Sequence, residues 1–248
     1  MTVPSSSADR AVPDTVFGSA LSLFCAVALR KALEEHVLPA FKRATGATVD
    51  VLFEPTGLLL QRIEAGARPG IFLGTTGSLE ASAVTDIFDL PSCKPVAKSG
   101  IGVAVPPAAH RPDIGSVHGL IDALTTARSV AYSRNGPSGI YFARLIRDLG
   151  IAHQVNTRST IVDHGPTAYA LLDGRADIAI HQLSELMLVP EAAIVGPLPR
   201  LVQHYTEFSA TLSRKALNDA LASALVGFLS GPLAARAYRA SGLQSPWE

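Results

Sequence analysis

Residues 127–149 read A-R-S-V-A-Y-S-R-N-G-P-S-G-I-Y-F-A-R-L-I-R-D-L. The short run 129–132 contains β-branched and aromatic residues and predicts a buried strand. After the polar stretch 133–137, apolar residues recur at the spacing of one helix face. They are Ile140, Ala143, Leu145, Ile146 and Leu149. The stretch therefore predicts a strand, a polar loop and a helix.

The start of this predicted helix is a candidate anion site. Ser138 is a suitable N-cap residue, and Gly136 and Gly139 let a ligand approach the backbone closely. The N–H groups at the helix start carry partial positive charge and would face whatever lies at the end of the strand. An ordinary capped helix after a β-turn would contain the same residues, so this stretch alone leaves both interpretations open.

The chain before this stretch predicts three further strand–helix units. Strands are expected at 21–26, 48–53 and 70–74, with helices at 27–45, after the turn at 54–57, and after 75–78. Gly46 and Gly66 are expected to end the first two helices. Because parallel neighbouring strands need helical crossovers, this order predicts a mainly parallel sheet.

The chain after residue 97 repeats the pattern. Strands are expected at 101–105, 129–132, 157–162, 177–181 and 204–212, and helices at 117–125, 168–173, 215–229 and 233–241. The order of elements predicts an α/β protein of two lobes. Ligands of open α/β sheets bind at the carboxyl ends of the strands. The loops expected there carry hydroxyls, amides and a histidine, at Thr56, Thr75, Ser133, Ser138, His164, Gln182 and Ser184. Such groups suit a small oxyanion or carboxylate.

The composition limits the possible partners. Of the 248 residues, 21 are basic and 21 acidic, without a block of like charge, so nothing supports a nucleic-acid or membrane-surface partner. Cys25 and Cys93 form neither a metal-ligand nor a redox pattern and are expected to be buried free thiols. No apolar stretch reaches the length of about 20 residues that a membrane span requires.

The first 14 residues are polar and contain two prolines. They lack the order of basic, apolar and small residues that marks a secretory signal. We therefore expect residues 1–14 to form a loose tail and the protein to be cytoplasmic.

Four motifs carry a resemblance to a known family: F-E-P-T-G-L-L-L-Q-R-I-E-A-G at 53–66, I-G-V-A-V at 101–105, G-P-S-G-I-Y-F-A-R-L at 136–145 and G-R-A-D-I-A-I-H-Q-L-S-E-L at 174–186. With this order of elements the chain resembles the bacterial extracytoplasmic solute-binding proteins of two-lobed type II topology, in the molybdate-binding branch. The resemblance implies that 15–97 and 200–248 form one lobe and 98–199 the other. It also implies a ligand in the cleft, held by the loop after the first strand, the Thr56–Gly57 turn, the Ser138–Gly139 helix start and the loop after 177–181.

Some positions depart from a molybdate binder. Val27 and Ala28 stand near the place of a usual serine, and Gln182 takes the place of a usual tyrosine. The closer resemblance, through V-A-L-R at 27–30, G-P-S-G-I-Y-F and Q-L-S-E, is to a sub-branch that includes aconitate isomerase. It implies a cis–trans or allylic isomerase of a small unsaturated di- or tricarboxylate, active in the breakdown of lignin-derived aromatics. It further implies no metal or organic cofactor and a monomer or homodimer. The alternative is a non-catalytic binding protein of an ABC transporter for a molybdate-like oxyanion or a carboxylate.

An isomerase of this kind needs a group that moves a proton, because tautomerisation makes the conjugated double bond transiently single. The leading candidates are Glu185 and His164, followed by Glu54 and His181. Glu185 could equally begin a helix, and His164 could equally belong to a structural turn.

The expected substrate-binding residues supply guanidinium, hydroxyl, amide and backbone N–H donors. Arg30 could instead form a surface salt bridge, Tyr141 could pack in the core, and Ser184 could cap a helix. The full set is Arg30, Thr56, Gly57, Ser133, Ser138, Gly139, Tyr141, Gln182 and Ser184.

Overall fold

The computed structural model describes residues 21–80 and 82–246, so the tail expected at 1–14 lies outside the described residues. Within these ranges, nine strands form one sheet in the order β2-β1-β3-β9-β4-β7-β5-β6, with β8 beside β4. The strands are β1 (Ser22–Ala26), β2 (Asp50–Glu54), β3 (Ile71–Thr75), β4 (Lys94–Val105), β5 (Val130–Ser133), β6 (Thr160–Val162), β7 (Ile178–Gln182), β8 (Ala193–Pro197) and β9 (Tyr205–Leu212).

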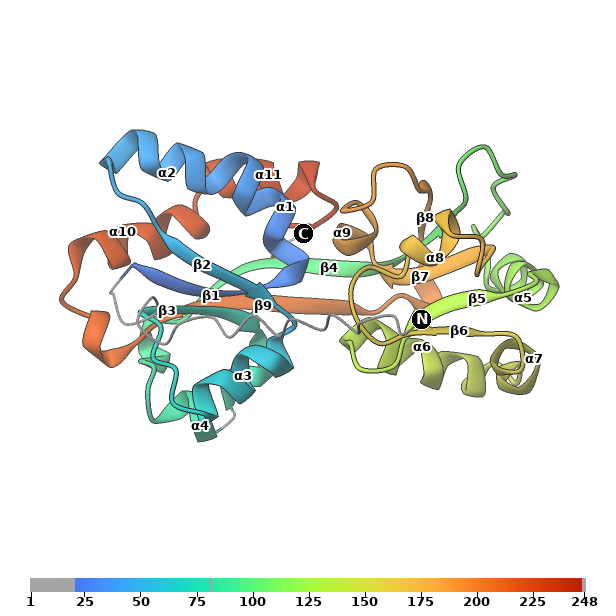
Figure 1. Cartoon of the computed structure of the whole chain (residues 1–248), viewed down its shortest axis with the longest axis horizontal. Helices are drawn as coiled ribbons and strands as arrows, with labels where there is room; N and C mark the ends of the chain where they lie inside the picture. The colour runs from blue at the N-terminus through green and yellow to red at the C-terminus, as the bar shows by residue number, and fades with distance from the viewer. Residues whose placement is uncertain (1–20, 81, 247–248) are drawn as a thin grey trace, which may run out of the picture.

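The molecule is a two-lobed α/β fold in which the long strands β4 and β9 run from one lobe into the other (Figure 1). β4 pairs with β9 in its first half, up to Gly100, and with β7 and β8 from Ile101 onward. β1, β2 and β3 are parallel in the first lobe, as are β5, β6 and β7 in the second. The predicted parallel arrangement is therefore correct for these strands, whereas β4, β8 and β9 pair antiparallel.

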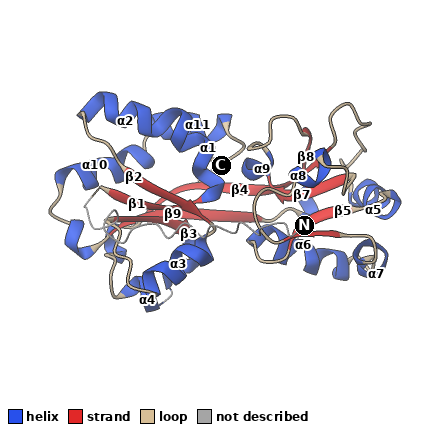
Figure 2. Cartoon of the chain, viewed as in Figure 1, coloured by secondary structure: helices blue, strands red, loops and turns tan. Residues whose placement is uncertain are grey.

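Helices cover both faces of each lobe's sheet (Figures 1 and 2). In the first lobe these are α1 (Arg30–Ala32), α2 (Leu38–Thr45), α3 (Thr56–Glu64), α4 (Ser82–Thr85), α10 (Ala220–Leu229) and α11 (Pro232–Ala240). In the second lobe they are α5 (Val117–Thr126), α6 (Pro137–Asp148), α7 (Ala152–Asn156), α8 (Tyr169–Leu172) and α9 (Leu183–Leu186).

Each lobe has a core on both faces of its sheet. Along β1, Leu23 and Cys25 face the core beneath α2, α10 and α11, while Phe24 faces the core beneath α3. Successive strand residues point to opposite faces, so a sheet covered on both sides buries all of them. The second lobe repeats this arrangement, with α5, α6 and α7 over one face and α8 and α9 over the other.

The helix expected at 27–45 is interrupted. It begins as a 3-10 turn, Val27–Leu29, and contains a π-helical turn, Leu33–Val37, before α2. Pro39 has no N–H group and its ring would clash with the carbonyl four residues earlier. The hydrogen bonding shifts just before this proline, where the Leu38 N–H bonds the Leu33 carbonyl. Gly46 ends the helix with a positive φ of 76°, as the sequence predicts.

Other element limits also differ from the prediction. α10 starts at Ala220 rather than residue 215, because the Asp219 side chain accepts hydrogen bonds from the N–H groups of Leu221 and Ala222. The sequence pattern does not predict β8 or α7, and β4 is seven residues longer at its start than the expected strand at 101–105. The lobe limits expected at 97/98 and 199/200 stay predictions.

Within residues 21–80 and 82–246, no single helix is long and apolar enough to cross a membrane. The bent pair of α10 and α11 passes that test by length and composition only.

Candidate functional site

A cleft of about 430 Å³ is lined by loops from both lobes, at the carboxyl ends of the strands. Its first-lobe wall comes from the segments that follow β1 and β2, and from Thr75 and Phe208. Its second-lobe wall comes from the loops after β5, β6 and β7. The expected residues Thr56, Gly57, Ser133, His164, Gln182 and Glu185 all line it.

The side chains of a histidine and a glutamate form a buried contact in this cleft. His181 lies near the end of β7 and Glu185 lies in α9, and their side chains meet with Nε2 and Oε2 3.2 Å apart. The residues are only 5% and 9% exposed. The Thr167 N–H donates to His181 Nδ1 over 3.5 Å, which orients the ring with Nε2 toward the glutamate. The arrangement joins an oriented imidazole to a carboxylate, the two group types most used for proton transfer.

Two buried polar atoms, one in the cleft lining and one beside it, lack a hydrogen-bond partner among the described residues. They are the Oε1 atom of Gln182, which lines the cleft, and the Oγ atom of Ser138, next to the lining residue Pro137. A buried polar group without a partner costs about 1–3 kcal/mol. A donor on a ligand would complete Gln182 Oε1, and an acceptor that reaches the start of α6 would complete the Ser138 hydroxyl.

Two helices of at least two turns begin at the cleft, one on each wall. α3 follows Pro55 and α6 follows Gly136, residues whose side chains provide no hydrogen-bond acceptor for the helix start. The prediction that Ser138 is the N-cap is wrong: Gly136 is the cap and Pro137 the first helical residue, which places Ser138 inside the helix. Pro137 has no N–H and is favoured at this first position. The helix starts therefore remain available to an anion.

Ser133 and Gly139 shape the loop before α6. The Ser133 Oγ accepts the N–H of Gly136 over 3.3 Å. A Cβ atom on Gly139 would lie 1.5 Å from the Ser133 carbonyl oxygen, so only glycine fits there. Gly139 acts by close packing and is not part of the cleft lining.

Five predicted binding residues lie outside the cleft lining: Ser138 and Gly139 in the first turn of α6, and three that each have another partner. Arg30 pairs with Glu34, with 3.0 Å between Nε and Oε2, the surface salt bridge that its sequence context left open. The Tyr141 hydroxyl donates to the Val202 carbonyl over 3.0 Å, and its ring stacks on His204. The Ser184 and Ser99 hydroxyls are 3.2 Å apart. We therefore withdraw these three residues from the site.

The cleft also contains residues that sequence reasoning misses or ranks low. His181 is a minor candidate there, although the H-Q-L-S-E spacing places it four residues before Glu185, within reach across the strand end. Asp163 precedes His164 in a loop that is predicted to face the ligand. Phe208 comes from β9, and no local pattern indicates its position.

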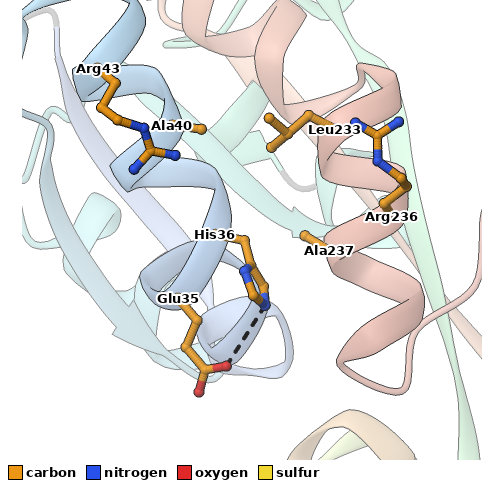
Figure 3. A pocket seen from close by; sticks show the side chains of 7 residues that line it. All are labelled: Glu35, His36, Ala40, Arg43, Leu233, Arg236 and Ala237. Atoms are coloured by element: carbon orange, nitrogen blue, oxygen red, sulfur yellow. Dashed lines mark ion pairs between the residues drawn. The ribbon is translucent and has the colours of Figure 1, made fainter.

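A smaller hollow of about 240 Å³ lies between the π-helical turn and α2 on one side and α11 on the other (Figure 3). It is lined in part by Glu35, His36, Arg43 and Arg236. Glu35 already pairs with Lys31 and lies 3.9 Å from His36. It contains none of the predicted site residues, so the cleft between the lobes is the candidate functional site.

The cysteines lie apart from the cleft lining. Burial and the nearby Glu34 charge raise the pKa of Cys25 well above its usual value, and partial burial raises the pKa of Cys93. Both are free thiols, but Cys93 is only partly buried, contrary to the expectation. Among the described residues, no group of three or more His, Cys, Asp or Glu side chains is placed to hold a metal ion.

The fold and the interlobe cleft define a class of two-lobed ligand-binding proteins. Residues 21–244 match the family described as bacterial extracellular solute-binding protein, and the chain belongs to this family. It is similar to aconitate isomerase of Pseudomonas sp., with 28% identity over 215 residues that cover 84% of this chain and 82% of that protein.

Solved structures share the fold. The periplasmic molybdate-binding protein of Azotobacter vinelandii has a TM-score of 0.72 at 18% identity, with 91% of this chain and 99% of that chain covered. The substrate-binding domain of a putative molybdenum ABC transporter from Clostridium difficile has a TM-score of 0.69 at 14% identity, covering 90% and 97%. Peb3 from Campylobacter jejuni has a TM-score of 0.67 at 14% identity, covering 90% and 99%.

These comparisons contradict the expected cytoplasmic location. The family is described as extracellular and the molybdate-binding protein as periplasmic, which points to a periplasmic location. The polar composition of residues 1–14, on which the expectation was based, did not decide the compartment.

Proposed function

We propose that the cleft binds a small unsaturated di- or tricarboxylate and isomerises it by proton transfer. The observation that carries this proposal is the buried pair of His181 and Glu185 in a cleft that two helix starts also line. The similarity to an aconitate isomerase over most of both chains supports the same reaction class.

In this mechanism, Glu185 removes a proton from the carbon next to the substrate's double bond. The electron pair of the broken C–H bond spreads through the conjugated system onto a substrate carboxylate, and the original double bond becomes single. Rotation about that bond and return of the proton give the other isomer. His181 Nε2 lies 3.2 Å from Oε2 of Glu185 and orients the carboxylate. We assign the proton removed from the substrate to the other oxygen of Glu185.

The helix starts of α3 and α6 have a second role in this reaction. Negative charge on the substrate increases at its carboxylate when the proton leaves. Backbone N–H groups that are already oriented stabilise such charge without reorganisation. We assign the Ser138 hydroxyl, which has no partner among the described residues, as a further donor to the same carboxylate.

The test is a proton NMR time course in D2O with trans-aconitate and with trans-glutaconate. We expect E-to-Z conversion with deuterium uptake at the allylic carbon. Glu185→Gln should lower the rate about 10²- to 10⁴-fold, the range for loss of a general base. Glu191→Gln, which changes an exposed glutamate outside the cleft lining, is the matched control.

The second candidate function is non-catalytic binding of a carboxylate or a molybdate-like oxyanion. The family assignment and the fold shared with a molybdate-binding protein favour it. Calorimetry with molybdate and with both carboxylates separates the two functions. Saturable binding without isomerisation or deuterium uptake would replace the isomerase by this candidate.

A further inference from the structure

The charges in the cleft lining are unevenly distributed. Its ionisable side chains, Asp163, His164, His181 and Glu185, all belong to the second-lobe wall. The first-lobe wall presents apolar side chains, including Val27, Leu58 and Phe208, together with the hydroxyls of Thr56 and Thr75 and the amide of Gln61. Among the described residues that line the cleft there is no lysine or arginine.

Two arginines near the first-lobe wall are already paired. Arg30 binds Glu34, and Arg62 binds Glu54 with 2.6 Å between Nε and Oε2. Neither guanidinium is part of the cleft lining. The charge of an anionic ligand must therefore be balanced mainly by the helix starts and by polar side chains.

These groups provide two places for a carboxylate, one on each wall. The start of α3 lies on the first-lobe wall with Thr56. The start of α6 lies on the second-lobe wall, where Gly136 and Pro137 line the cleft and the unpartnered Ser138 hydroxyl follows them. A helix start carries roughly half a positive charge and suits one anionic group. A third carboxylate would meet no further helix start in the lining. Its remaining neighbours are apolar side chains, the neutral amides of Gln61 and Asn135, and the histidine-bearing wall that already carries the carboxylates of Asp163 and Glu185. A desolvated charge is unfavourable where mainly neutral or like-charged groups face it.

We infer that the cleft selects an unsaturated dicarboxylate with carboxylates at the two ends of a hydrocarbon chain, and discriminates against tricarboxylates. This inference rests on the proposed function, because it concerns the same cleft. One carboxylate binds at α3, the other at α6, and the hydrocarbon middle contacts the apolar wall beside Glu185.

The two probes of the test differ by a single carboxylate. trans-Glutaconate and trans-aconitate share a three-carbon propene chain with a carboxylate at each end, and aconitate carries a third on the central carbon. Calorimetry of the wild-type protein near pH 7.5 should show at least 10-fold tighter binding of glutaconate. Equal or tighter binding of aconitate would overturn the inference and leave the proposed function standing. Failure of both compounds to bind and to react would instead overturn the proposed function.

A charge-adding variant tests the cause of the selectivity. Leu58→Arg places a cation on the apolar wall at a residue that is 39% exposed, and it should reduce the preference for glutaconate at least 10-fold. Leu201→Arg makes the same change at a 90% exposed leucine outside the cleft lining and should leave the preference unchanged. An unchanged preference in a Leu58→Arg protein that melts like the wild type would contradict the electrostatic explanation. If that variant does not fold, the wild-type comparison still decides the inference.

Discussion

Two buried side chains, one in the cleft lining and one beside it, each hold a polar atom without a hydrogen-bond partner among the described residues. Ser138 is 1% exposed and Gln182 is 2% exposed, and each has a polar atom without a partner. Natural proteins pair nearly all such atoms. The Ser138 hydroxyl is a donor that a carboxylate can complete, whereas the Gln182 oxygen needs a donor from the ligand.

Replacing Ser138 by alanine should separate stability from binding. The free energy of unfolding of Ser138→Ala should rise by about 1 kcal/mol, because an unsatisfied buried hydroxyl is removed. Carboxylate affinity should fall about 10- to 100-fold, because a hydrogen bond to a charged group contributes about 1.5–3 kcal/mol. Urea denaturation and calorimetry measure the two quantities.

Ser241 provides the matched control for this variant. Its Oγ atom is also buried without a partner, but it lies at the end of α11 and outside the cleft lining. Ser241→Ala should show a similar gain in stability with unchanged affinity. Unchanged ligand affinity in Ser138→Ala would remove Ser138 from the binding site.

At the scale of secondary-structure elements, the site depends on how closely α6 packs against the end of β5. Alanine at position 139 would place its Cβ against the Ser133 carbonyl, so the start of α6 must move. We expect Gly139→Ala to lower the free energy of unfolding by about 1–3 kcal/mol, the usual effect of overpacking. Ligand affinity should fall as well, because the displaced helix start no longer aligns with the cleft.

Gly227→Ala tests whether the expected loss of stability in Gly139→Ala comes from replacing a helical glycine or from the close packing around Gly139. Gly227 lies within α10 and is exposed, and a Cβ atom added to it would meet no atom of a neighbouring residue within 4 Å. Because alanine favours a helix by about 1 kcal/mol over glycine, this variant should be more stable than the wild type. A stabilised Gly139→Ala protein with normal affinity would contradict the packing argument.

The elements are largely predictable from the sequence because their signals are local. The strand and helix around Gly136 follow from β-branched residues, a proline and apolar spacing, and Gly46 ends its helix as expected. The predicted cap is misplaced because Pro137 and Ser138 are both typical of helix starts and the sequence does not rank them. The π-helical turn escapes prediction because apolar spacing alone does not show the effect of Pro39 on the hydrogen bonding.

At the scale of the whole molecule, the site residues that escape prediction are those brought together by distant strands. Phe208 reaches the cleft because β9 lies between β3 and β4, and this pairing has no counterpart in local periodicity. Arg30 and Tyr141 are expected in the cleft because each lies near a helix start. In the structure their partners, Glu34 and the Val202 carbonyl, keep them outside the lining.

Because the cleft lining comes from both lobes, a bound ligand should stabilise both. A ligand at 100 times its dissociation constant that binds only the folded protein raises the free energy of unfolding by about 2.7 kcal/mol. We expect this gain with trans-glutaconate, and we expect slower amide hydrogen exchange in β1 of the first lobe and in β7 of the second. Hydrogen exchange with mass spectrometry measures the two strands separately.

The comparison of hydrogen exchange in β1 and β7 tests whether the ligand contacts both walls of the cleft. Each strand is fully buried in its own lobe and ends at the cleft, so burial alone does not make amide exchange slower in one strand than in the other. A ligand held by one wall would protect only one of them. A ligand that joins the start of α3 to the start of α6 must protect both, because opening either lobe breaks one of its two carboxylate contacts. Protection confined to a single lobe would therefore exclude a ligand that bridges the cleft.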